Sequence, residues 1–210
     1  MADILLWLMG KKITVHNTNV ECPLPMRAHG ICTNRRNQSH SFMTFSCTAK
    51  VISKIGNLKE VTAEKSDVDL SNWYVDLLKL NRKTYFLFTN SMSLFSFVIY
   101  VGTKKEISAL EDLFTTKLKE QVVREYGVNC LQNTYFDSNL ESFTYKKTNS
   151  RSILGSMNDF KLNIESEIQH NGLNLESVNS INHYLSIMPM GYLKYKSPRE
   201  SFKDELDKVQ

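Results

Sequence analysis

Two neighbouring apolar segments constrain the fold more than any other feature of this sequence. Residues 84–89 and 94–101 are rich in aromatic and β-branched side chains, and residues 90–93 between them have the composition of a turn. This pattern predicts an antiparallel hairpin with a four-residue loop. Both predicted strands are apolar on both faces, so the hairpin is expected to lie centrally in a sheet that is covered on each side.

The remaining periodicity predicts an α+β domain, in which a small antiparallel sheet built around the central hairpin is packed with about four to five helices. Capping residues and helical spacing predict a short helix after Ser71, longer helices at about 104–126, 151–169 and 175–188, and a short C-terminal helix from Pro198. Capping boxes are expected at 103–106 and 197–200. A brief helix is also expected from Thr48 to about Ile55, and further strands at 43–47 and 141–148.

The composition of the chain changes near Met43. Residues 10–42 lack a sustained period, which predicts an irregular N-terminal extension over 1–42 and a single α+β domain over 43–210. One hypothesis is that Met43 is the native start and that 1–42 is an upstream translation. The extension has five basic and two acidic residues, so it carries +3 of the chain's net charge of +4. The domain itself is nearly neutral at +1, which does not favour a general nucleic-acid binder.

The sequence predicts a cytoplasmic protein without membrane association. The apolar run at residues 4–9 is too short for a membrane span, and no basic region precedes it, so a signal peptide is not expected. The four cysteines are widely spaced, imply no disulfide framework and fit a reducing compartment. They are Cys22, Cys32, Cys47 and Cys130.

The segment 149–160 combines a high density of polar side chains with the start of a predicted helix. A helix start is a natural site for a cap, an anion or a ligand. In the functional interpretation, Arg151 recognises an anion, Asp159 orients the ligand or accepts a proton, and Gly155 lets a ligand come close. In the structural interpretation, Ser152 or Ser156 caps the helix, Asp159 complements its positive end, and Gly155 permits close packing on the sheet.

Four segments of the chain resemble one protein family. They are W-Y-V-D-L-L-K-L at 73–80, F-L-F-T-N at 86–90, Asn149 with R-S-I-L-G-S-M-N-D-F at 151–160, and M-P-M-G at 188–191. The chain resembles an uncharacterised bacterial family, a domain of unknown function that bacteria and their mobile elements often encode. The resemblance covers about 43–202 and is most specific at L-G-S-M-N-D. It implies these domain limits and a cytoplasmic bacterial setting, and it offers no catalytic residues and no reaction.

The leading hypothesis is a small binding or interaction module that recognises a polar or anionic group at the start of the 151–169 helix. Its partner would be a small polar ligand or another protein. Whether the chain is also an enzyme is left open by the sequence. The predicted ligand-binding residues are Arg151, Ser152, Ser156, Asn158, Asp159 and Asn182.

Two alternatives belong to other functional classes. The first is a hydrolase or transferase that uses Asp159 as its acid–base residue, for which a raised pKa in a cleft would be the sign. The second is a nucleic-acid-associated protein of a mobile element. That alternative requires a clustered basic face made by Arg82, Lys83, Lys104, Lys105, Lys146 and Lys147.

No metal and no cofactor is predicted from the sequence. The spacing of the histidines and cysteines near the N-terminus does not match the close pairs of a zinc site. Zinc-protease, phosphate-loop, nucleophile-elbow and dinucleotide-binding motifs are absent from the sequence. The residues considered for zinc are His16, Cys22, His29, Cys32 and His40.

Overall fold

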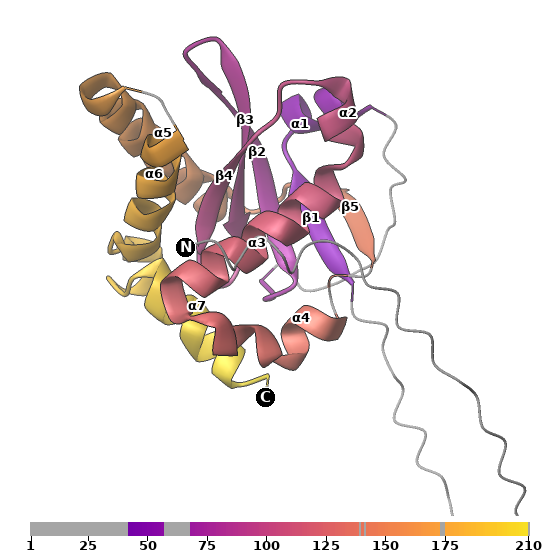
Figure 1. Cartoon of the computed structure of the whole chain (residues 1–210), viewed down its shortest axis with the longest axis vertical. Helices are drawn as coiled ribbons and strands as arrows, with labels where there is room; N and C mark the ends of the chain where they lie inside the picture. Colours follow the sequence, from indigo (N-terminus) through magenta and orange to yellow (C-terminus); the bar gives the residue numbers. More distant parts are fainter. Residues whose placement is uncertain (1–41, 57–67, 139, 141, 173–174, 210) are drawn as a thin grey trace, which may run out of the picture. The chain divides into compact units, whose positions relative to one another are not determined.

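A five-stranded sheet in the order β4-β3-β2-β1-β5 organises the part of the chain that the structure describes (Figure 1). This computed structural model describes residues 42–56, 68–138, 140, 142–172 and 175–209. The strands are β1 (Met43–Cys47), β2 (Asn72–Leu80), β3 (Lys83–Asn90), β4 (Ser96–Tyr100) and β5 (Phe143–Lys147). The helices are α1 (Ala49–Ile55), α2 (Lys104–Ser108), α3 (Leu110–Tyr126), α4 (Thr134–Ser138), α5 (Arg151–Asn171), α6 (Leu175–Ile187) and α7 (Pro198–Asp207), with short 3-10 helices η2 (Val128–Gln132) and η3 (Gly191–Leu193).

The predicted α+β class and the central hairpin are confirmed. Strand β3 pairs antiparallel with β2 on one side and with β4 on the other. The sheet is mixed, however, and the prediction of an antiparallel sheet was wrong for β1, which runs parallel to both β2 and β5. The alternation of side chains along a strand fixes which face each residue occupies, but it carries no information about the direction of the neighbouring strand.

Both faces of the sheet are covered, as the apolar strands predicted. An aromatic-rich core lies between one face and helices α1, α3, α4 and α7. A more aliphatic core lies between the opposite face and helices α5 and α6. Figure 1 shows α3 crossing one face of the sheet while α5 and α6 lie on the other side. We call these the α3 face and the α5 face.

Phe114 of α3 is the centre of the aromatic core. Its side chain is fully buried, and its ring lies 4.9 Å from the Phe45 ring, 5.2 Å from Trp73 and 5.0 Å from Phe88, measured between centroids. These three rings come from β1, β2 and β3. One helical side chain therefore contacts three adjacent strands, which fixes the position of α3 over the middle of the sheet.

The predicted helix after Ser71 is absent, because residues 72–80 form strand β2. A short apolar run cannot be assigned to helix or strand from its periodicity alone. Here the β-prone residues Trp73, Tyr74 and Val75 are buried on alternating faces, which satisfies both cores at once. The pairing with β3 extends from Trp73 to Leu80 and decides the outcome.

The other predicted elements agree with the structure in type. The helix predicted at 104–126 is divided at Ala109 into α2 and α3, and the predicted capping box of Thr103 and Glu106 begins α2. The strand at 143–147 and helices α5, α6 and α7 are confirmed, whereas α4 was not predicted. Residues 1–41 of the predicted extension lie outside the described residues. The polar composition of residues 60–69 predicts a loop, most of which also lies outside them. Among the described helices none is long and apolar enough to cross a membrane.

Truncation of the central ring should have a large effect on stability. We expect Phe114→Ala to lower the free energy of unfolding by about 3–5 kcal/mol, because it removes a fully buried ring and leaves a cavity against three strands. Urea unfolding monitored by circular dichroism measures this. Val123→Ala is the control on the same helix, where the side chain is 37% exposed and a change within about 0.5 kcal/mol is expected. Equal losses in the two variants would contradict the central role of Phe114.

Candidate functional site

The start of α5 is anchored to the sheet by its own polar residues. The Ser150 hydroxyl accepts a hydrogen bond from the Ile153 amide and caps the helix, so the expected caps, Ser152 or Ser156, were wrong. The Tyr74 hydroxyl of β2 donates to Asn149 Oδ1 at 2.7 Å and accepts from the Ser150 amide at 3.2 Å. Part of the 149–160 motif is therefore explained by attachment of α5 to β2.

Gly155 has no neighbour that would require a glycine. A Cβ placed on Gly155 would meet no atom within 4 Å outside its own helix, so close packing on the sheet does not account for this residue. On either side of it along the helix, Ile153 and Met157 are fully buried in the aliphatic core. The open space above Gly155 is compatible with the approach of a ligand.

Four of the six predicted ligand-binding residues lie together on α5. Arg151, Ser152, Asn158 and Asp159 are exposed on the first three turns of the helix. Within the described residues, the Asp159 carboxylate forms no hydrogen bond or ion pair; only its backbone carbonyl is engaged, by Asn163 at 2.8 Å.

The other two predicted residues have structural partners. Ser156 is buried, and its hydroxyl donates to the Ser152 carbonyl at 3.3 Å. Asn182 is buried on α6, where its Oδ1 accepts a hydrogen bond from the Val98 amide at 2.9 Å. Val98 belongs to β4, an edge strand, so Asn182 covers a backbone group that has no neighbouring strand to bond.

A buried ion pair lies where β1 ends, and the sequence did not indicate it. Asp76 of β2 accepts hydrogen bonds from the Thr48 hydroxyl at 2.6 Å and from the Leu77 amide at 2.7 Å. Its second carboxylate oxygen accepts from Lys161 of α5. The side chains of Asp76 and Lys161 are only 10% and 17% exposed. Asp76 was missed because residues 71–78 were expected to be helical, which hid its position on the sheet.

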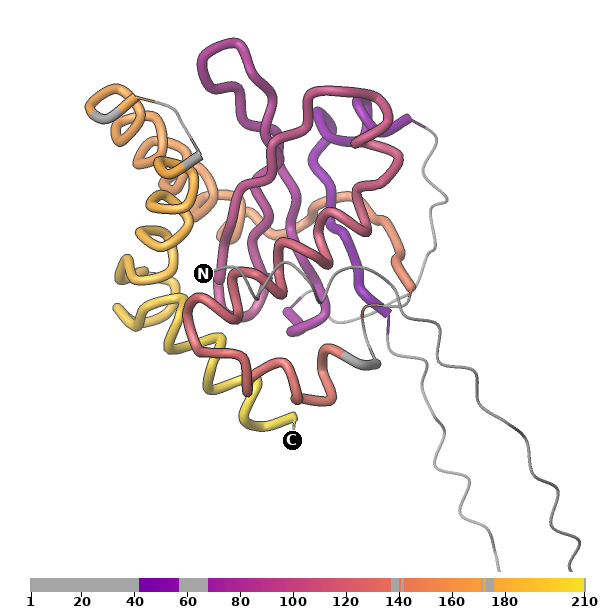
Figure 2. Tube along the Cα trace, viewed as in Figure 1, coloured from indigo at the N-terminus to yellow at the C-terminus, as the bar shows by residue number. Residues whose placement is uncertain are grey.

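The carboxyl ends of β1 and β5 lie side by side, and the chain leaves them toward opposite faces. After β1 it enters α1 on the α3 face, whereas after β5 it passes to α5 on the other face (Figure 2). In open sheets, ligands bind at such divergent ends of neighbouring parallel strands. A pocket of about 360 Å³ opens here, lined by Cys47, Ala49, Ile52, Ser53, Lys147 and Thr148.

The cysteine that lines the pocket is not a thiolate at neutral pH. Burial raises the pKa of the Cys47 thiol to about 12, so the sulfur stays protonated and unreactive. Over the described ranges, no three His, Cys, Asp or Glu side chains come together in a way that would hold a metal ion.

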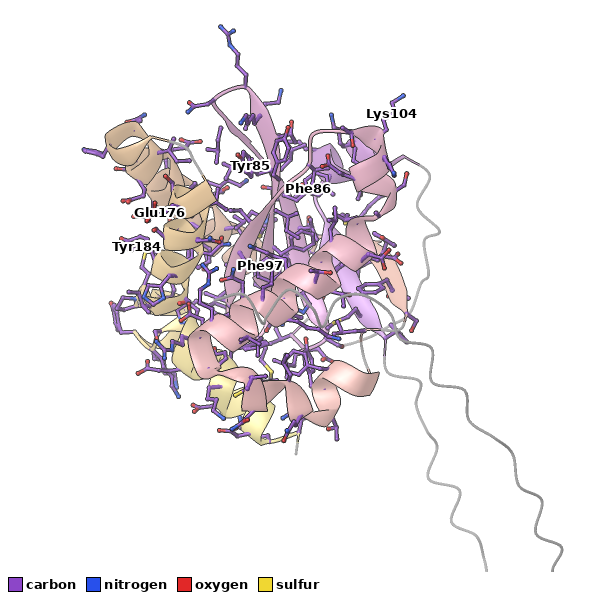
Figure 3. All side chains as sticks on the ribbon, viewed as in Figure 1. Tyr85, Phe86, Phe97, Lys104, Glu176 and Tyr184 are labelled. Carbon is purple, nitrogen blue, oxygen red and sulfur yellow. The ribbon has the colours of Figure 1, made fainter. Side chains whose placement is uncertain are left out.

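Exposed basic side chains gather at the same end of the sheet. They extend from α1 and α2, from the turn that joins β2 to β3, and from the end of β5; Figure 3 shows Lys104 pointing away from the sheet. None of them forms an ion pair with another described residue. We call this surface the basic end, and define it by eight residues: Lys50, Lys54, Lys79, Arg82, Lys83, Lys104, Lys105 and Lys147.

Five of the six residues required for the predicted basic face belong to the basic end. The sixth, Lys146, is half-buried beside Lys147. Three lysines near the C-terminus differ, because Lys196, Lys203 and Lys208 are each paired with a carboxylate of α7. The sequence showed a nearly neutral domain, but it did not show that eight of the unpaired cations are brought to one end.

Removal of the buried carboxylate should be costly. We expect Asp76→Ala to lower the free energy of unfolding by about 3–5 kcal/mol, because it leaves the Lys161 ammonium buried without a partner. The double variant Asp76→Leu with Lys161→Met should be close to the wild type, since it removes both charges together. Chemical denaturation of both variants measures this. A loss of less than about 1 kcal/mol for Asp76→Ala would show that water reaches the pair.

Gly155 can be tested by filling its open space. We expect Gly155→Ala to raise the free energy of unfolding by about 1 kcal/mol, because alanine favours the helix and its methyl group meets no atom. Thermal and urea unfolding measure the change. A destabilised variant would show that this space is occupied in the folded protein.

Comparison with known proteins identifies a family of unknown function. No curated protein matches the chain. The model of one family, described as a domain of unknown function (DUF6933), matches residues 44–201. These limits are close to those expected from the sequence, about 43–202. The chain belongs to the DUF6933 family.

Proposed function

We propose that this domain is a binding module that recognises an anionic partner through the basic end. The observation that supports it most directly is the segregation of charge. Eight exposed cations gather at one end of the sheet without a carboxylate partner among the described residues, although residues 43–210 have a net charge of only +1. Like charges held together repel one another, so such a surface favours an anionic ligand that offsets the repulsion.

Within the described ranges, the carboxylates closest in sequence to the basic end have hydrogen-bond or ion-pair partners of their own. Glu106 of α2 accepts hydrogen bonds from the amides of Gly102 and Thr103, which lower its pKa. Glu111 accepts a hydrogen bond from the Tyr145 hydroxyl at 2.8 Å, and Asp76 holds Lys161. None of these three carboxylates forms an ion pair with a residue of the basic end. The positive electrostatic potential of the surface lysines and of Arg82 therefore extends into the solvent.

A small polar or anionic group at the start of α5 is the second candidate ligand. It is supported by the exposed Arg151, Ser152, Asn158 and Asp159 and by the open space at Gly155. The hydrolase or transferase alternative depends on Asp159 as the acid–base residue. Since that carboxylate is exposed and has no partner among the described residues, the geometry favours binding over catalysis.

We expect charge reversal at α2 to weaken binding to a polyanion. We expect Lys104→Glu with Lys105→Glu to bind fluorescein-labelled heparin roughly tenfold or more weakly than the wild type at low salt, because two phosphate-like contacts are lost. The change should not disrupt folding, since acidic side chains are favourable in the first turn of a helix. Fluorescence anisotropy measures the dissociation constant, and circular dichroism confirms the fold.

The matched control is Lys119→Glu with Arg124→Glu on α3. It changes the net charge by the same amount at two exposed basic residues that lie outside the basic end and have no ion-pair partner among the described residues. We expect it to bind heparin nearly as well as the wild type. Equal losses in both variants would show that only net charge matters, and no binding by the wild type would overturn the proposal.

A further inference from the structure

The turn between β2 and β3 holds an arginine in a conformation that favours glycine. The two turn residues, Asn81 and Arg82, have φ angles of 47° and 65°, and Leu80 pairs with Lys83 on either side of them. Left-handed residues at both central positions are typical of a two-residue hairpin turn in which asparagine is followed by glycine. Asparagine tolerates this conformation, whereas arginine pays a steric cost there. Strain of this kind is concentrated at functional sites.

This hairpin extends beyond its neighbours in the sheet. The last residue of β1, Cys47, is opposite Val75, and the last residue of β4, Tyr100, is opposite Tyr85, which pairs with Leu78. The Val101 amide, just after β4, still donates to the Thr84 carbonyl, so the two-stranded ribbon continues past this edge for about two residues, or about 7 Å at about 3.3 Å per residue. Figure 1 shows this ribbon projecting from the end of the sheet, next to α1 and α2.

The tip of the ribbon is polar and positively charged. Lys79, Asn81, Arg82 and Lys83 are exposed, while Leu80 is 4% exposed and packs in the aliphatic core. The tip therefore presents no apolar side chain that could enter a lipid bilayer, which a membrane-binding surface would need. The Lys83 ammonium lies 5.9 Å from the centroid of the Tyr100 ring, a contact that restricts its position at the base of the tip.

We propose that the hairpin tip enters the major groove of duplex DNA and that Arg82 contacts the DNA at the bottom or edge of that groove. The B-form major groove is about 12 Å wide and 8.5 Å deep and admits a two-stranded ribbon, so a projection of about 7 Å brings its floor within reach of the Arg82 side chain. The lysines of α1 and α2 stand beside the ribbon and meet the flanking phosphates. The major groove of duplex RNA is too narrow for the ribbon. This inference rests on the proposed function, because it names the anionic partner of the basic end.

The test compares three single variants of the full chain with the wild type. Arg82→Gly removes the charge and relieves the strained turn, Arg82→Lys keeps the charge, and Arg124→Gln removes one exposed arginine from α3 as the control. Each protein is titrated into a fluorescein-labelled 20-base-pair DNA duplex, and anisotropy is recorded over a series of salt concentrations. The melting temperature of each variant is measured in parallel.

We expect Arg82→Gly to bind the duplex about eightfold more weakly in 0.1 M salt, and the slope of log K against log salt to become shallower by about 0.9, as for the loss of one phosphate contact. Its melting temperature should rise. Arg82→Lys should retain most of the affinity, and Arg124→Gln should match the wild type. Unchanged affinity in Arg82→Gly would overturn the role of the hairpin tip.

The choice of nucleic acid separates this inference from the proposed function. Binding to heparin without binding to the DNA duplex would overturn the inference and leave the proposed function standing. Tighter binding to single-stranded DNA or to an RNA duplex than to the DNA duplex would also overturn insertion into the groove. Absence of binding to all four probes would overturn both.

Discussion

The structure depends on the burial of one antiparallel core, strands β2, β3 and β4, on both of its faces. These strands carry apolar side chains on each face, so exposing either face to water would be unfavourable. The aromatic cluster around Phe114 satisfies one face, and the stripe of Ile153, Met157 and Phe160 on α5 satisfies the other. All the other elements, including the loops that carry polar and charged residues, take their positions from these two contacts.

The surface properties follow from the way β1 and β5 join this core. Both strands run parallel to β2, so their carboxyl ends lie at the same end of the sheet as the turn between β2 and β3. Helices α1 and α2 follow directly from strands that finish there, at β1 and β4. Basic residues that are far apart in the sequence are thereby gathered on one surface. The buried pair of Asp76 and Lys161 lies just below it and ties α5 to β2.

The sequence predicted the features that are locally encoded. The hairpin, α5, α6 and the capping boxes at Thr103 and Ser197 each depend on residues close together in the chain, and the structure confirms them. Strand β2 was wrongly expected to be a helix. Its secondary structure is determined by pairing with β3 and not by its own sequence pattern. The parallel direction of β1 depends on pairing with strands about 28 and 100 residues away, for which the sequence pattern has no signal.

The candidate site was predictable only in part, for the same reason. The polar start of α5 was found from a local motif, and four of its six proposed residues share one exposed surface. Asn182 was assigned to that site, but its side-chain oxygen accepts a hydrogen bond from the backbone of the edge strand β4. From the sequence, a basic face could be stated only as a condition for nucleic-acid binding. Whether the lysines at 104–105 and 146–147 lie close together depends on the topology of the sheet.

The most direct test of the account is to map the binding surface residue by residue. Amide chemical shifts of the isotopically labelled chain would be recorded by nuclear magnetic resonance during titration with the 20-base-pair DNA duplex. The account predicts shifts concentrated at residues 50–54, 79–83 and 104–105, with α7 unaffected. Shifts concentrated on α7, or spread evenly over the surface, would contradict the claim that the basic end is the binding site.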